Sequence, residues 1–222
     1  MKKILCTLIA SLSLLVFSTG CTEQPAKSGE QTTAPQAQSE VVATINGEPI
    51  TSEDIDFYQV INRIQIDLMR EKDLAKSSDA EKEAVKKFWE EQEQEAMHPN
   101  SLLTQIIRLR AMALLGKEKG HQATEQEVNQ EIEKVKKEYT ANQLVQSRIK
   151  EYGEEKFWNK QKSQYQLIVV VNKVQQDMIA KAKEGNPKAE MKEINMLAQK
   201  KYEELLVSQM SSLEIKIVNQ GK

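Results

Sequence analysis

Residues 41–51 read Val41-Val42-Ala43-Thr44-Ile45-Asn46-Gly47-Glu48-Pro49-Ile50-Thr51, and this stretch decides the fold of the chain. Two short apolar segments flank Asn46-Gly47, which is the strongest local signal for a tight β-hairpin. Pro49 has no N–H to donate, so the second strand must be short or lie at a sheet edge. Thr51 and Asp54 have the spacing of a capping box, which predicts that a helix follows the hairpin directly.

Most of the remaining sequence carries apolar residues at helical spacing, which predicts a mainly α fold with several helices. The predicted helices are one that follows Thr51, those over 78–96 and 101–119, one opened by Thr124, one over 154–184, and a last one with Pro187 at its first position. Apolar residues surround most of the 154–184 helix, so we expect neighbours to bury it. Its segment 167–171, Leu-Ile-Val-Val-Val, could form a strand instead, and helix is favoured.

Residues 213–217, Leu-Glu-Ile-Lys-Ile, alternate apolar and charged side chains, which predicts a strand. A lone strand would leave its backbone groups unpaired, so it needs a partner. The 41–50 hairpin is the obvious one. We therefore expect a small β-sheet that joins the N-terminal hairpin to this C-terminal strand.

The first 20 residues have the layout of a secretory signal peptide. Two lysines precede the apolar run Ile4–Phe17, whose length of about 14 residues is short of the roughly 20 that span a membrane. The run leads into Ser18-Thr19-Gly20-Cys21, which resembles the lipobox of bacterial lipoproteins, with serine where that group usually has leucine. Lipidation of Cys21 would add two acyl chains, enough for a stable membrane anchor. The alternative is an ordinary signal peptide cut near Gly20, which leaves a free thiol.

Three segments are expected: a lipoprotein signal peptide over 1–20, a disordered tether over 21–40, and one helical domain over 41–222. Residues 22–40 hold no large apolar side chain, so nothing there offsets the entropy of ordering. Fully extended, the tether could hold the domain up to about 60 Å from the bilayer. The chain is thus predicted to act at the cell envelope, on the outer face of the cytoplasmic membrane.

Composition excludes several classes of function. Removal of the signal peptide lowers the count of Lys and Arg from 31 to 29 against 33 Asp and Glu, a net charge of −4, which argues against nucleic acid as a partner. One cysteine remains after Cys6 is removed, so no disulfide framework is expected. His98 and His121 lie in no metal-ligand spacing, and no pattern of acids, bases or nucleophiles indicates an enzyme. We expect no metal, no cofactor and no catalytic residue.

Three parts of the chain, in order, resemble the SurA N-terminal domain family of extracytoplasmic chaperones. Residues 41–51 are similar to its opening. Residues 102–120, followed by Thr124-Glu125-Gln126-Glu127-Val128, are similar to its helix that ends in glycine before a capped helix with acidic first-turn residues. Residues 152–174 resemble its helix with an aromatic residue and then a stretch rich in Gln and Leu. The resemblance covers most of residues 41–180.

The chain departs from that family in two ways. Arg108 and Arg110 stand where the family often carries an acidic residue, which concerns local ion pairs and not the fold. Members with prolyl isomerase activity carry a parvulin domain after this module, and its motifs are absent here. The resemblance therefore implies the chaperone module without the isomerase. In the family, a C-terminal helix completes the module, a role that residues 186–210 could fill.

Four apolar residues are candidates for polypeptide binding: Phe88, Trp89, Met196 and Val207. Met196 and Val207 fall opposite the apolar stripe of the last helix, and Phe88 and Trp89 stand on a charged helix. The alternative for all four is ordinary packing. Together with the resemblance, they predict an ATP-independent folding helper that binds unfolded or nascent exported polypeptides, and a homodimer is compatible with this role. The competing hypothesis is a structural or regulatory lipoprotein that docks one folded envelope partner.

Overall fold

The computed structural model describes residues 39–218, of which 77% are helical, and confirms a mainly α fold with a small antiparallel sheet. The elements in chain order are β1 (Val41–Ile45), β2 (Glu48–Thr51), α1 (Ser52–Leu74), α2 (Lys82–Ala96), α3 (Pro99–Glu118), α4 (Glu125–Thr140), α5 (Gln143–Tyr152), α6 (Glu154–Gly185), α7 (Met191–Ser212) and β3 (Ile215–Ile217). The predicted signal peptide, Cys21 and most of the predicted tether lie outside the described residues. Within 39–218, no helix combines the length and the apolar character that crossing a membrane requires.

The predicted hairpin is confirmed. Asn46 and Gly47 both have positive φ, 49° and 84°, as the two central residues of a type I′ turn require. The strands β1 and β2 pair antiparallel, with Ile45 opposite Glu48, next to the turn. Pro49 lies on the edge strand β2, where its missing N–H breaks no ladder in the sheet centre.

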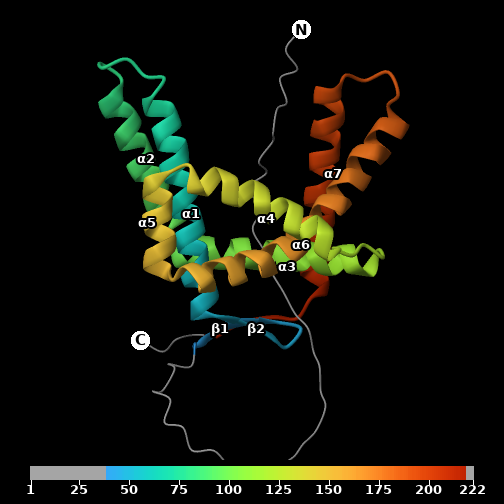
Figure 1. The fold of residues 1–222 in the computed structure, drawn as a ribbon. Coiled ribbons are helices and arrows are strands. Elements are labelled where there is room, and N and C mark those ends of the chain that lie inside the picture. The colour runs from blue at the N-terminus through green and yellow to red at the C-terminus, as the bar shows by residue number, and fades with distance from the viewer. Residues whose placement is uncertain (1–38, 219–222) are drawn as a thin grey trace, which may run out of the picture.

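The strand β3 pairs antiparallel with β1, so the sheet order is β2-β1-β3 and the predicted partnership is confirmed. The turn residue Asn46 strengthens the link between the hairpin and the C-terminal end of the described chain. Its N–H donates to the carbonyl oxygen of Glu214 at 2.8 Å, and its side-chain Oδ1 accepts from the Glu214 N–H at 2.9 Å. The two ends of the described chain are therefore held side by side in one sheet (Figure 1).

The helices form a body with two projecting arms (Figure 1). We call the helical hairpin of residues 66–96, the C-terminal part of α1 with α2, arm 1. Arm 2 is the hairpin of residues 176–207, the end of α6 with most of α7. Both arms rise on the side of the body that faces away from the sheet, and α3, α4 and α5 lie in the body below and between them.

Helix α3 lies at the centre of the core. Leu102, Ile106, Leu109 and Met112 along it are fully buried. Near its C-terminus, Gly116 lets α3 approach α6 so closely that a Cβ placed there would lie 2.4 Å from Val170 Cγ1. The helix α6 also packs on α7 and α4, as its apolar circumference predicted, and residues 167–171 are helical rather than extended.

Several predicted boundaries are wrong. The helix α2 begins at Lys82, because the Ser78 N–H and hydroxyl bind the Glu81 carboxylate in a turn that precedes the helix. Pro99, rather than Ser101, opens α3, because proline suits the first helical position. Pro187 does not open α7, which begins at Met191 after a turn.

The helix that Thr124 opens is followed by a second helix that was not predicted. The capping box of Thr124 and Glu127 is present as predicted, and α4 ends at Thr140. Asn142 then caps α5, its Oδ1 accepting from the Val145 N–H at 3.1 Å. An asparagine that caps a new helix changes the chain direction without any proline or glycine.

Candidate functional site

Arm 1 carries apolar side chains that no other part of the described chain covers. Phe88 on α2 is 51% exposed, and Met69 on α1 is also exposed. Trp89 is half-buried: its ring meets Phe88 edge-on, with ring centroids 5.2 Å apart, and its Nε1 donates to Asp73 Oδ2 at 3.2 Å. The Phe88 side chain is thus open to solvent, whereas Trp89 also connects α2 to α1 through its hydrogen bond to Asp73.

The helix α2 is held to α1 mainly at its polar edge. No residue of α2 is buried. Arg63 Nε donates to the Glu93 carboxylate at 3.1 Å, and Asn62 Nδ2 donates to the Ala96 carbonyl oxygen at 3.1 Å. Exposed ion pairs of this kind contribute about 0–1 kcal/mol, so α2 is attached less firmly than the core helices. Local opening therefore requires less free energy at arm 1 than in the body.

Arm 2 presents a second set of apolar side chains. Met196 and Val207, the two candidates on α7, are 60% and 62% exposed, and Leu197 is exposed as well. The opposite face of α7 buries Ile194, Ala198, Tyr202 and Leu206. Met191, the first residue of α7, is exposed as well.

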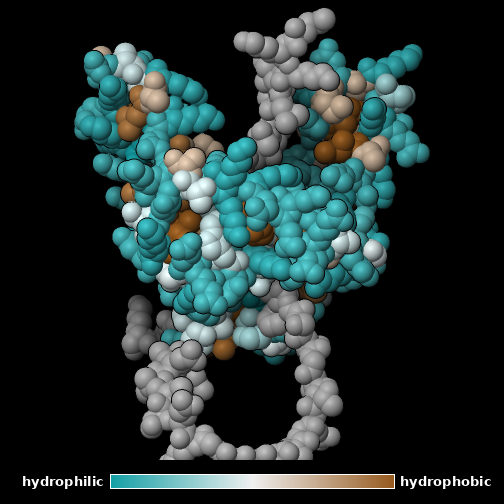
Figure 2. All heavy atoms as spheres, in the orientation of Figure 1, coloured by the Kyte–Doolittle hydropathy of each residue, from teal (hydrophilic) through white to brown (hydrophobic). Residues whose placement is uncertain are grey.

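The four candidate residues do not form one site. Phe88 and Trp89 lie on arm 1, and Met196 and Val207 lie on arm 2. Figure 2 shows apolar surface on both arms, set in a surface that is otherwise largely hydrophilic, and the molecule is hollowed between the arms. The structure therefore offers two separate apolar areas on the same side of the body.

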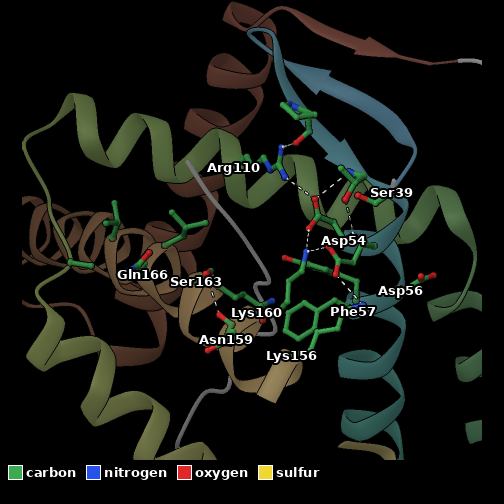
Figure 3. A pocket seen from close by; sticks show the side chains of 18 of the residues that line it. Ser39, Asp54, Asp56, Phe57, Arg110, Lys156, Asn159, Lys160, Ser163 and Gln166 are labelled. Carbon is green, nitrogen blue, oxygen red and sulfur yellow. Dashed lines mark hydrogen bonds and ion pairs between the residues drawn. The ribbon is translucent and has the colours of Figure 1, made fainter. Parts of the chain in front are cut away.

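A second feature, which the sequence did not reveal, is a polar groove on the body. Its walls are the start of α1, the middle of α3, the loop between α3 and α4, and the first half of α6, and its volume is about 2030 Å³. Residues at the centre of the wall form the network drawn in Figure 3. We call this cavity the polar groove. It lies on the body and not between the arms.

Asp54 organises one wall of the polar groove. Its carboxylate accepts the Thr51 N–H at 3.2 Å, as the predicted capping box requires, and also binds Lys160 Nζ at 2.8 Å and Arg110 at 3.3 Å (Figure 3). Glu53 next to it binds Lys156 and Lys160 at 3.0 and 3.1 Å. Burial raises the pKa of Glu53, but the hydrogen bonds from the two lysines outweigh it and leave that pKa below its usual value.

Arg110 is buried and joins three elements. Its guanidinium donates to the Pro49 carbonyl oxygen at 2.6 Å and to Asp54, so it connects β2 and α1 to α3. Burial lowers its pKa to about 10, against the opposing effect of Asp54, and it stays charged near neutral pH. Arg108, the other departure from the family pattern, binds Glu203 on α7 at 2.8 Å. Both arginines therefore have structural partners.

Two glutamines of α6 lie where apolar residues would be expected. Gln161 and Gln164 are both buried, and Gln164 lines the polar groove. They follow Phe157 at four and seven residues, the spacing of a buried helical stripe. Polar residues on such a stripe were the one signal in the sequence that could have indicated this groove.

The two histidines have separate partners. His98 Nδ1 accepts from the Asn100 N–H at 3.3 Å and caps α3. His121 Nε2 lies 2.9 Å from Asp177 Oδ2, which ties the loop after α3 to α6. In the described part of the chain, no three His, Cys, Asp or Glu side chains form a group that could hold a metal ion.

Comparison of the chain with protein-family models, with curated proteins and with solved structures gives no match. The similarity to the SurA N-terminal domain family therefore stays a prediction from the residues quoted above.

Proposed function

We propose that this chain is a membrane-anchored extracytoplasmic lipoprotein that acts as an ATP-independent chaperone for unfolded exported polypeptides and has no isomerase domain of its own. The observation that supports it best is the pair of arms with exposed apolar side chains, Phe88 on one and Met196 and Val207 on the other. The sequence resemblance and the predicted lipid anchor at Cys21 point in the same direction.

The chemistry of the arms suits varied partners. Exposed apolar side chains gain about 25 cal/mol for each Å² of apolar surface that a partner removes from water. The unbranched thioether chains of Met69 and Met196 adapt to different shapes, as binding sites for many sequences require. Each apolar area is small, so each should bind weakly, but one unfolded chain that contacts both arms gains from their linkage.

The hydrophilic surface around the apolar areas suits release of a client. The surface of the molecule outside the apolar areas is largely hydrophilic (Figure 2). A client chain would therefore be held at a few apolar side chains and not engulfed. Because the described residues include no nucleotide-binding motif, binding and release would follow from these weak contacts alone.

Suppression of aggregation tests the proposal. The variant Phe88→Gln/Met196→Gln/Val207→Gln removes one apolar contact on arm 1 and two on arm 2, and Gln is a good helix former, so both arms should fold. We expect the wild-type chain to slow the light scattering of a denatured model protein and the triple variant to lose most of this effect.

The matched control is Ile217→Thr on β3. This side chain is as exposed as the arm residues but lies on the sheet, on the far side of the body from the arms (Figure 1). It should suppress aggregation like wild type. Equal activity of the triple variant and wild type would refute the role of the arms. Capture of one stoichiometric folded partner, with no effect on aggregation, would favour the docking lipoprotein instead.

A further inference from the structure

The two edges of the small sheet are built differently. The edge strand β2 carries Pro49, which has no N–H and so cannot form a complete ladder with another strand. The other edge is β3, and no strand among residues 39–218 pairs with its outer side. An exposed edge strand is a template for pairing with another chain, so the outer edge of β3 is a candidate contact surface.

The hydrogen bonds between β3 and the hairpin show which backbone groups of β3 point outwards. The Glu214 carbonyl oxygen and the Val218 N–H both bond to the hairpin, at 2.8 and 2.9 Å. In an antiparallel pair, every second residue of a strand bonds to the same neighbour. The N–H and C=O groups of Ile215 and Ile217 therefore point away from β1, along the open edge.

The body leaves room beside β3. Ile217 lies opposite Ala43 in the sheet, and the side chains of opposite residues point to the same face. Ala43 is fully buried against the body, whereas Ile217 on that same face is 63% exposed. The helices that cover the centre of the sheet therefore do not extend over its β3 edge, and a further strand can lie there.

The charges of β3 fit a second copy of the same strand. Glu214 and Lys216 stand on the face of the sheet that points away from the body, with side chains 62% and 67% exposed. If two copies pair antiparallel with Ile215 opposite Ile215, each Glu214 faces the Lys216 of the other copy. A shift of two residues in either direction would set Lys216 opposite Lys216 or Glu214 opposite Glu214, which is unfavourable. A shift of one residue would send the side chains to the wrong face.

We propose that two copies of this chain form a dimer through β3, paired antiparallel with Ile215 opposite Ile215. The two Ile215 residues exchange both backbone hydrogen bonds, and each Ile217 N–H reaches the Leu213 carbonyl oxygen of the other copy, which gives about four bonds in all. The Leu213 N–H takes no part, because it donates to the Met210 carbonyl oxygen at 3.4 Å. The combined sheet has the order β2-β1-β3-β3-β1-β2, so the strand that carries Pro49 lies at both outer edges.

This pairing places both bodies on the same side of the combined sheet, because opposite residues of an antiparallel pair share a face. The arms rise away from the sheet and so point in the same direction in both copies (Figure 1). Only β3 of each copy takes part, so the dimer is weaker than one with an interface of standard size. No arm residue contributes, so this inference does not depend on the proposed function. Ile217→Thr, the control for the arms, keeps a β-branched side chain and every backbone group, and leaves the pairing in place.

Sedimentation equilibrium tests the dimer on residues 22–222, a chain that contains every described residue and no cysteine. We expect wild type to dimerise with a Kd below about 1 mM. Glu214→Lys sets like charges opposite each other twice and should raise the Kd at least about tenfold. Adding Lys216→Glu makes the charges opposite again and should restore the Kd of wild type. Glu184→Lys, the same change of charge at an exposed position of arm 2, should leave the Kd unchanged.

Cysteine cross-linking tests the register. Ile215→Cys places two thiols on residues that face each other, with Cα atoms about 5.5 Å apart, which is within the range of a disulfide. It should therefore give a disulfide-linked dimer. In Lys216→Cys the two thiols are offset by two positions along the strands, with Cα atoms more than about 7 Å apart, and this variant should not cross-link.

Four results would overturn the proposal. Wild type that stays monomeric up to about 1 mM forms no such dimer. A dimer whose Kd is insensitive to Glu214→Lys, or is not restored by the double variant, pairs through another surface. Cross-linking of Lys216→Cys in place of Ile215→Cys would show a different register. Cross-linking of Ile215→Cys to an unfolded model protein that carries a cysteine, and not to a second copy, would assign the edge to a client strand. Loss of aggregation suppression in the arm variants bears on none of these measurements, so the two proposals fail separately.

Discussion

Replacement of Gly116 by alanine tests the close contact between α3 and α6. The new Cβ would lie 2.4 Å from Val170 Cγ1 and 3.1 Å from Val174 Cγ2, so one of the helices must move. Val170 is buried, and its branched side chain has one preferred rotamer in a helix, so the methyl group cannot turn away cheaply. Overpacking of this kind costs about 1–3 kcal/mol.

The same substitution, Gly116→Ala, also brings a gain in helix stability. Alanine stabilises a helix interior by about 0.5–1 kcal/mol relative to glycine. The net effect on the free energy of unfolding should therefore be a loss of about 1 kcal/mol, the difference between the midpoints of these two ranges. At Gly185, where an added Cβ meets nothing within 4 Å, alanine should bring only the gain.

Urea unfolding followed by circular dichroism measures the stability of both variants. A double-mutant cycle with Val170 separates the cost of the clash between α3 and α6 from the gain in helix propensity. Val170→Ala removes the clashing methyl group, so the cost of Gly116→Ala should largely vanish in its presence. A coupling energy of about 1 kcal/mol or more is expected for residues in direct contact. If Gly116→Ala is as stable as wild type, or if the two substitutions are simply additive, the close approach of α3 and α6 is not as described.

Two further predictions concern the ion pairs and caps. Arg110→Met leaves the Asp54 carboxylate and the Pro49 carbonyl oxygen without this buried partner. It should lower the free energy of unfolding, measured in urea, by about 3–5 kcal/mol. A loss below about 1 kcal/mol would contradict the role of Arg110 in connecting β2 and α1 to α3. The hydrogen bonds from Lys173 and from Thr124 lower the pKa of Glu127 from 4.5 to about 2. Because the pKa is lower in the folded chain, this stabilisation is complete above pH 4.5 and is lost as the pH falls from 4.5 towards 2. Glu127→Gln should therefore flatten the decline of the urea midpoint with falling pH in this window, whereas Glu133→Gln, on the exposed face of the same helix, should not.

The parts of the fold that depend on local chemistry could be predicted from the sequence. Asn46-Gly47 fixes the hairpin because few other residue pairs accept two positive φ angles. Thr51 and Thr124 cap their helices through a side chain three residues away, which the sequence shows directly. The helical wheel placed Met196 and Val207 opposite the apolar stripe, but it left open whether another element covers them; the structure shows both exposed.

What could not be predicted depends on residues far apart in the chain. The polar groove brings together α1, α3 and α6, and its ion pairs join Asp54 to Arg110 and Lys160, more than 50 residues away. No local pattern indicates such a partnership. The start of α7 was also misplaced. Pro187 has the local signature of a helix start, but it lies in a turn, and three residues separate it from Met191, the first residue of α7.

The pairing of β1 with β3 has a consequence for the order in which the domain folds. The bond between Asn46 and Glu214 joins residues 168 positions apart. Contacts between such distant positions form slowly, because a long loop must close first. A chain delivered N-terminus first cannot complete its sheet until residues 215–217 have followed. A product that ends before β3 would keep an open edge on β1, whose unpaired backbone groups could pair with a strand of another chain. The strand β3 therefore covers the open edge of β1, and it can do so only after all the helices have been delivered.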